Sequence, residues 1–288
     1  MAGSTTTTLN DLLPQIVAEA MFVASERSIM RGLVKNYSLD DGQGKTVTVP
    51  IYPKQTAAAL TEGDEISNTA VSTDGATLTV STVAIRTLVT DLAVASAASN
   101  VVADLGRLFG EAIARKIDLD LTARFEQLVA GQGNYTAAIS AADVFKAVAK
   151  LKAAGVPTDG MVCVLHPEIA YDLKAALTTQ GNTPFTAGAY GDVANEAMRM
   201  GYVGQLAGIP VFETSNIAGS TNGNPGDIPG AVFHMDCLGL AMIGDISIET
   251  QRRASYLGTD VVGYCHYGQG ILYNDYGRGL WFDSSINP

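Results

Sequence analysis

The sequence has little charge, and positive charge is the scarcer kind. Charged residues make up 16% of its 288 residues, and 18 lysines and arginines stand against 29 acidic residues, a formal net charge of -11. A protein that reads nucleic acid concentrates positive charge to neutralise phosphates, so the composition argues against that class. The hydrophobic fraction of 47% excludes an intrinsically disordered chain.

Cysteines and long apolar runs are also scarce. The three cysteines, an odd number spaced far apart, predict no disulfide framework and a reducing compartment; they are Cys163, Cys237 and Cys265. The first basic residue is Arg27, which excludes an ordinary secretory signal. The most apolar stretch, 230–244, is too short to span a bilayer. These features predict a soluble protein without a membrane partner.

Motifs for catalysis or metal binding are missing as well. The sequence contains no nucleophile elbow, phosphate loop, dinucleotide fingerprint or zinc-protease motif. His166 lies three residues from Cys163, a spacing that points side chains to opposite faces of a strand. Asp118 and Asp120 lie about 200° apart around a helix, so they cannot cooperate as acid and base. We therefore predict no catalytic, cofactor-binding or metal-binding residues.

Two alternating runs predict an extended hairpin. Residues 45–51 alternate polar and apolar side chains, and a second run over 77–83 ends near Val89. An acidic stretch between them contains Glu62, Asp64 and Glu65. Because an isolated two-stranded hairpin is marginally stable in water, we expect this one to lie on another subunit. The alternative is two strands of an ordinary sheet joined by a loop.

The longest periodic segment predicts a helix from Ser99 or Asn100 to Leu128. Apolar residues recur in steps of three or four, and Gly131 follows as a stop signal. A helix of about 30 residues would be about 45 Å long. Two acid-first pairs at the favourable i,i+4 spacing are expected on its polar face: Glu111 with Arg115, and Asp120 with Arg124.

Shorter elements follow this helix. Ser140 and Asp143 form a capping box for a helix that ends at Gly155, and its expected buried stripe is Val144, Phe145, Val148 and Leu151. The remaining expected elements are a buried strand at 161–165, a helix from Pro167 to Leu177, a loop at 178–201, and strands at 208–213, 231–235, 239–248 and 261–273.

This order of elements resembles the HK97-type fold of tailed-bacteriophage major capsid proteins. Three segments carry the resemblance: "ISAADVFKAVAKLKAAGVPTDGMVCVLHPEIAYDLKAAL", "GQLAGIPVFETSNI" and "DISIETQRRASYLGTDVVGYCHYGQGILYNDYG". The resemblance implies an α+β fold in five parts. These are an N-terminal arm (1–43), an extended hairpin or E-loop (44–93), a peripheral domain with the spine helix (94–160), an axial domain (161–244), and closing strands of the peripheral domain with a return to the axial domain (245–288).

The resemblance also implies a function without catalysis or a cofactor. Copies of the chain would form hexamers and pentamers of an icosahedral shell in the virion, enclosing double-stranded DNA without sequence-specific binding. Expected partners are a portal, a separate scaffolding protein and a decoration protein, with assembly in the host bacterial cytoplasm. Two alternatives stay open: an encapsulin-like compartment and a cytoplasmic α+β enzyme with a dispersed site.

Charged residues at two places are candidates for contacts between subunits. They are the acidic residues Glu62, Asp64 and Glu65 of the hairpin, and the adjacent arginines Arg252 and Arg253. We expect them to form opposite-sign contacts across subunit boundaries. The alternative is that both groups are solvated surface, where an ion pair contributes about 0–1 kcal/mol.

Overall fold

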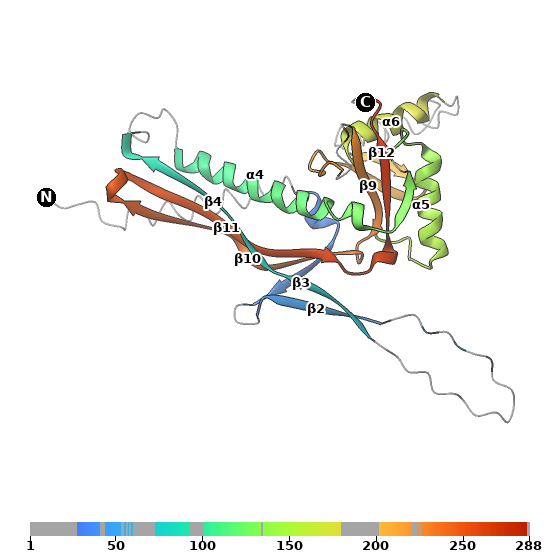
Figure 1. Cartoon of the computed structure of the whole chain (residues 1–288), viewed down its shortest axis with the longest axis horizontal. Coiled ribbons are helices and arrows are strands. Elements are labelled where there is room, and N and C mark those ends of the chain that lie inside the picture. The colour runs from blue at the N-terminus through green and yellow to red at the C-terminus, as the bar shows by residue number, and fades with distance from the viewer. Residues whose placement is uncertain are drawn as a thin grey trace.

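The protein is elongated, with a thick lobe at one end and a hairpin that projects from the long axis (Figure 1). The computed structural model describes residues 28–40, 44–52, 55, 57, 59, 73–92, 101–133, 135–179, 202–220, 224 and 226–286. Strands in this part of the chain form a four-stranded sheet in the order β1-β10-β11-β4, a six-stranded sheet in the order β5-β12-β9-β6-β8-β7, and the two-stranded hairpin β2-β3.

The four-stranded sheet is long and narrow because two of its strands are long. Its strands are β1 (Lys35–Leu39), β10 (Leu238–Arg253), β11 (Gly258–Ile271) and β4 (Ser81–Thr90). Strand β1 pairs in parallel with β10, whereas the other pairings are antiparallel. The β10–β11 register shifts between Ile243 and Ser247, where Gly244 has a φ of 64°. This irregularity separates the part of β10 that pairs with β1 from the part that runs to the far end of the sheet.

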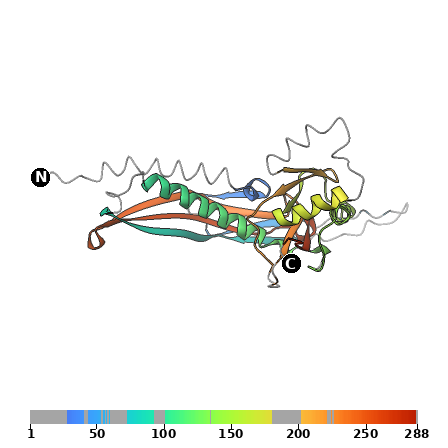
Figure 2. The same cartoon turned by 90° about the horizontal axis from the view of Figure 1, so that it is seen from above.

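Helix α4 (Val101–Thr122) lies along one face of this sheet (Figures 1 and 2). Phe109 belongs to a small core at the outer part of the sheet, where its ring packs against Gly263 of β11. Ile113, Ile117 and Leu121 continue the same helix face into a larger core, which α4 shares with residues of both sheets. The helical spacing of these residues in the sequence therefore corresponds to one buried stripe, as predicted.

The end of α4 differs from the prediction. The helix has 22 residues and stops at Thr122, whose hydroxyl lies 3.1 Å from the Leu119 carbonyl oxygen and 3.0 Å from that of Asn216. The chain then turns into the 3-10 helix η2 (Phe125–Gln127), which buries Phe125 completely. The expected pairing of Arg124 with Asp120 is wrong, because Arg124 donates to Gln269 and Gln127 instead.

The thick lobe is built on the six-stranded sheet. One of its two central strands, β6, is buried at all five residues, as the continuous apolar run predicted. Helices α5 and α6 lie in this lobe (Figure 1), and they share one hydrophobic core with β6, β8 and β12. The lobe's elements are β5 (Ala130–Gly133), α5 (Ala141–Ala153), β6 (Met161–Leu165), α6 (Pro167–Thr179), β7 (Tyr202–Leu206), β8 (Ile209–Glu213), β9 (Asp227–His234) and β12 (Gly277–Asp283).

The capping box of α5 is confirmed, but one residue of its predicted stripe is not. The Ser140 backbone N–H donates to the Asp143 carboxylate over 3.2 Å. Burial would raise the pKa of Asp143, but hydrogen bonds from Ser140 and the neighbouring Lys146 ammonium outweigh it and hold that pKa below its usual value. Phe145 was expected to be buried and is 49% exposed, because the buried face contains Ala147 in its place.

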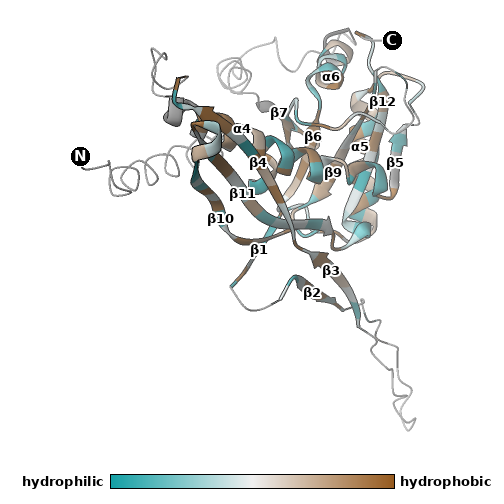
Figure 3. Ribbon diagram, turned by 60° about the vertical axis from the view of Figure 1, so that its left-hand side comes forward, coloured by the Kyte–Doolittle hydropathy of each residue, from teal (hydrophilic) through white to brown (hydrophobic). Residues whose placement is uncertain are grey.

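The hairpin consists of β2 (Thr46–Ile51) and β3 (Asp74–Thr79), paired antiparallel from Thr46–Thr79 to Ile51–Asp74. The prediction that the second alternating run belongs to the hairpin throughout is wrong. Beyond Val80 the chain becomes β4, which pairs with β11 in the body of the protein. Figure 3 shows the hairpin pointing away from both sheets.

The five-part division of the chain remains a prediction. It places α4 and α5 together in the range 94–160. In the structure, α4 contributes to the core beneath the long sheet, whereas α5 contributes to the second core in the lobe. The loop expected at 178–201 lies outside the described residues except for 178–179. The part of the arm before Ser28 lies outside them completely.

Candidate subunit-contact surfaces

The hairpin contacts the long sheet mainly through its root, where Leu78 and Val80 are buried; Val47, Val49 and Ala76 pack against the same small core and stay partly exposed. Leu78 is 1% exposed and packs with Leu39, Ala241 and Leu272 in a small core between the hairpin and the long sheet. Further out, β2 alternates exposed and half-buried residues, and its one strand neighbour in the described chain is β3. The outer edge of β2 therefore offers backbone hydrogen-bonding groups, and such an edge is a template for pairing with another chain.

A crossing of two backbones fixes the root of the hairpin. At the β3–β4 junction the chain passes directly over Gly268 of β11, so that a Cβ atom there would collide with the backbone of Thr79 and Val80. The Val80 N–H also donates to the Lys45 carbonyl oxygen over 2.8 Å. Glycine at residue 268 thus allows the close approach that sets the direction in which the hairpin leaves the body.

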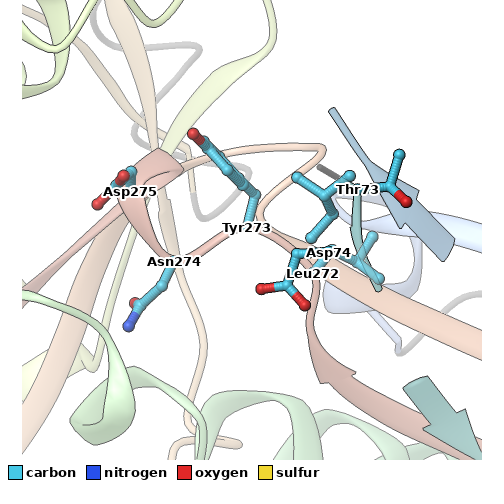
Figure 4. Close-up of a pocket in the computed structure, with 7 residues that line it drawn as sticks. Thr73, Asp74, Leu272, Tyr273, Asn274 and Asp275 are labelled. Atoms are coloured by element: carbon cyan, nitrogen blue, oxygen red, sulfur yellow. The ribbon is translucent and has the colours of Figure 1, made fainter. Parts of the chain in front are cut away.

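A cavity of about 630 Å³ lies at the other end of the described hairpin, where Ile51 pairs with Asp74. Figure 4 shows that its wall comes from the start of β3 and from the turn between β11 and β12. The Asp74 side chain lies near Leu272, with Tyr273, Asn274 and Asp275 following along the turn (Figure 4). The Asn274 side chain accepts a hydrogen bond from the Val129 N–H over 3.1 Å, which holds the turn in place.

The far end of the long sheet forms a second exposed surface, which we call the sheet tip and define as residues 91–92 and 254–257. Three large apolar side chains are exposed there: Leu92 (78%), Tyr256 (59%) and Leu257 (68%). Leu257 has a φ of 44°, in the left-handed region that favours glycine or asparagine. A cluster of exposed apolar side chains is a feature of protein contact surfaces.

Arg252 and Arg253, the arginines predicted to contact a neighbouring subunit, lie next to this tip. Both form ion pairs within the chain. Arg252 donates two hydrogen bonds to Asp91, one over 2.7 Å, and these bonds hold the pKa of the Asp91 carboxyl below its usual value. Arg253 pairs with Asp260, a buried carboxylate that also accepts from Arg86 over 2.9 Å. Their predicted role between subunits stays a prediction. Glu62, Asp64 and Glu65 lie outside the described residues.

A buried carboxylate joins the N-terminal segment, α4 and the lobe. Asp118 of α4 accepts hydrogen bonds from the Ser28 hydroxyl (2.9 Å), the Ile29 N–H (3.3 Å) and the Asn216 amide (3.5 Å). Burial raises the pKa of Asp118, although these hydrogen bonds oppose the shift. Asp120 points elsewhere, toward Lys116 and the Tyr267 hydroxyl, so the predicted divergence of the two carboxylates is confirmed.

The cysteines lie in the core. Burial raises the pKa of both Cys163 and Cys237 to about 12 and that of Cys265 to about 11, so all three are neutral thiols at neutral pH. Among the described residues, no group of three or more histidine, cysteine and acidic side chains is arranged to hold a metal ion. Within the same part of the chain, no helix is both long and apolar enough to cross a membrane.

Comparisons with known proteins match most of the chain. A family model described as phage capsid protein matches residues 46–279. The capsid structure of cyanophage P-SCSP1u is 21% identical to this chain, with a TM-score of 0.67 over 90% of this chain and 89% of that one. A protein of Mycobacterium phage Che8 is 20% identical, with a TM-score of 0.67 over 89% and 91%.

A third solved structure, the capsid of Ralstonia phage GP4, has a TM-score of 0.66 over 88% of this chain and 87% of that one. It is only 10% identical, so the fold persists where the sequence has diverged. No curated protein matches the sequence at a significant level.

Proposed function

The chain belongs to the phage capsid protein family, and on this premise we propose that its copies associate through two surfaces, the β2–β3 hairpin and the sheet tip. A capsid protein is a structural component of the virion, and it forms the phage shell by self-association. Membership of this family implies a structural rather than an enzymatic role.

The observation that carries the proposal is the hairpin itself. Two strands alone do not bury enough apolar surface to be stable in water. In the described chain this hairpin has its small core at the root and exposed residues along the outer part of β2. Contact with a neighbouring copy would cover the exposed face and pair the free edge.

We further propose an organisation of hexamers and pentamers in an icosahedral shell, assembled in the host bacterial cytoplasm. The shell would enclose double-stranded DNA without sequence-specific contacts, and the net charge of -11 supports this because a chain poor in positive charge does not neutralise phosphates. A portal, a scaffolding protein and a decoration protein are the expected partners. Uniform, correctly sized shells from the chain expressed alone would exclude the need for scaffolding.

The hairpin is tested at Tyr52, which follows β2 and is 70% exposed. Tyr52→Asn is expected to leave the unfolding of the unassembled chain unchanged and to lower the yield of shells, measured by sedimentation and electron microscopy. Tyr52→Phe, which keeps the apolar ring, is the matched control. Equal shell yields from both variants would contradict the role of this surface.

The sheet tip is tested separately. Leu257→Asn removes an exposed apolar side chain from a residue whose left-handed backbone asparagine tolerates well, so the chain itself should fold as before. Shell yield is expected to fall with Leu257→Asn and to persist with Leu257→Met.

The particles also distinguish this function from an encapsulin-like compartment. Nuclease-protected DNA inside purified particles supports the capsid, and enclosed cargo protein without DNA supports the compartment.

A further inference from the structure

Two carboxylates face each other at one end of the six-stranded sheet. Asp227 begins β9 and Asp283 ends β12, and the antiparallel register pairs them directly. The Asp227 N–H donates to the Asn224 carbonyl oxygen and the Asp283 N–H to that of Ala137, so neither bonds across the ladder. This makes them a non-hydrogen-bonded pair, the kind in which opposite Cα atoms are closest, at about 4.5 Å.

Within the part of the chain that the structure describes, neither carboxylate has a cationic partner. Asp227 is 4% exposed, and its Oδ2 atom is buried without a hydrogen-bond partner. The Oδ1 atom of Asp283 is also buried and without a partner. No ion pair to either carboxylate is found among the described residues. Like charges directly opposite in a sheet are destabilising, and a buried charge without a partner is costly.

The neighbouring groups add oxygen atoms and further negative charge. The Tyr135 ring stacks on Trp281, two residues before Asp283 on the same strand face, with ring centroids 6.2 Å apart. The Tyr135 hydroxyl donates to Glu126 over 2.8 Å. Burial raises the pKa of Tyr135, and the negative charges of Glu126 and Asp227 raise it further, while a hydrogen bond with Ser220 opposes them. Of the two facing carboxylates, Asp227 thus lies close enough to act on this hydroxyl.

We propose that Asp227 and Asp283 together bind a divalent cation that prefers oxygen ligands, Ca²⁺ or Mg²⁺. Carboxylate oxygens suit these hard cations, and Mg²⁺ is commonly held by one or two protein carboxylates with water completing the shell. The ion cancels the repulsion between the two side chains and supplies the partner that their buried oxygens lack. It thereby joins β9 to β12 at the end of β12 near the C-terminus (Figure 1).

The affinity is expected to be modest. With two carboxylates and water as ligands, the dissociation constant for Ca²⁺ is expected at about 10⁻⁴–10⁻³ M, the range of weak oxygen-ligand sites. At ten times that concentration, binding raises the folded-to-unfolded ratio about elevenfold, which corresponds to a rise in Tm of a few degrees.

The first experiment uses Tb³⁺, a luminescent substitute for Ca²⁺, with the full-length chain after treatment with a chelator. Trp281 is the single tryptophan of the chain, and it lies beside Asp283, so indole excitation should sensitise Tb³⁺ emission. We expect the emission to disappear in Asp227→Asn and to persist in Asp245→Asn, which changes an exposed carboxylate elsewhere. Competition by Ca²⁺ or Mg²⁺ identifies the preferred ion. Equal emission from both variants would overturn the proposal.

The second experiment measures thermal unfolding of the wild type and of the double variant Asp227→Asn, Asp283→Asn. Without divalent cations the double variant should be at least as stable as the wild type, because the repulsion is removed. Addition of Ca²⁺ or Mg²⁺ should raise the Tm of the wild type and leave that of the double variant unchanged. A wild-type Tm that neither ion raises, or a double variant less stable in chelator, would show that these carboxylates have a structural role without an ion.

Discussion

The lobe and the hairpin differ in how far their apolar side chains are buried within the single chain. In the lobe, all five residues of β6 are buried: Met161, Cys163 and Leu165 in the core with α5 and α6, and the other two on the opposite face of the sheet in the core with α4. In the hairpin, β2 alternates exposed and half-buried residues, and the fully buried residues of the shared core, Leu78 and Val80, lie at the root. The lobe therefore contributes to the stability of the single chain, whereas the hairpin exposes surface that a neighbouring copy can cover. Substitutions that affect one region and spare the other test this division.

The largest effect is expected at Phe233 in β9. Its ring is fully buried and lies 5.7 Å from that of Phe125, measured between ring centroids. Phe233→Ala removes a core ring and should lower the free energy of unfolding of the unassembled chain by about 3–5 kcal/mol. Thr48→Ala, at an exposed residue of β2, should change it by less than about 0.5 kcal/mol. Urea denaturation measures the free energy of unfolding of both variants. Comparable decreases in the two would contradict the proposed difference between the regions.

A smaller effect is expected where the hairpin root crosses β11. Gly268→Ala places a methyl group against the backbone of Thr79 and Val80, which cannot move without displacing β3 or β4. Overpacking of this kind costs about 1–3 kcal/mol. Gly219→Ala is the matched control, because nothing lies within 4 Å of a Cβ atom there. Denaturation of both variants measures the difference, which should be accompanied by a loss of shells for Gly268→Ala.

The smallest effect concerns the joint at Asp118, which connects the N-terminal segment to the lobe. Burial raises the pKa of this carboxyl above the unfolded value of 3.8, so the folded chain binds more protons than the unfolded chain between the two pKa values. The free energy of unfolding should consequently fall as the pH rises through that window. Asp118→Asn should remove this part of the pH dependence. Unfolding from about pH 4 to about pH 7 measures it, and identical slopes for wild type and variant would contradict the assignment.

The elements that the sequence predicted correctly are those determined by neighbouring residues. The capping box of Ser140 and Asp143, the apolar run of β6 and the proline at the start of α6 act within a few residues of chain. The order of these elements was enough to predict the capsid fold and family, and both are confirmed.

The errors arise where a distant residue decides the outcome. Alternation along 77–89 is the same whether a strand pairs with β2 or with β11, so the sequence could not place β4 in the body of the protein. Phe125 and Leu128 continue the helical spacing of α4, but they reach the core through a turn. Strands β5 and β7 are short and contain glycine, which gives little periodic signal.

The candidate contact residues show the same limit. The pair between Arg252 and Asp91 joins residues 161 apart in sequence, and no local pattern predicts it. The pairing of Asp227 with Asp283 depends on the β9–β12 register, which is equally non-local. Sequence reasoning missed the exposed tip residues Leu92, Tyr256 and Leu257, since single apolar residues in loops are common.

The parallel pairing of β1 with β10 has a mechanical consequence. Five consecutive residue pairs, from Lys35–Gly239 to Leu39–Ile243, hold the N-terminal segment at the edge of the long sheet. A pull on Lys35 along the strand loads these hydrogen bonds in shear, so that they bear the force together. Tension that enters at this end of the chain passes into the 16-residue β10, the longest strand described, and is spread over the length of the sheet.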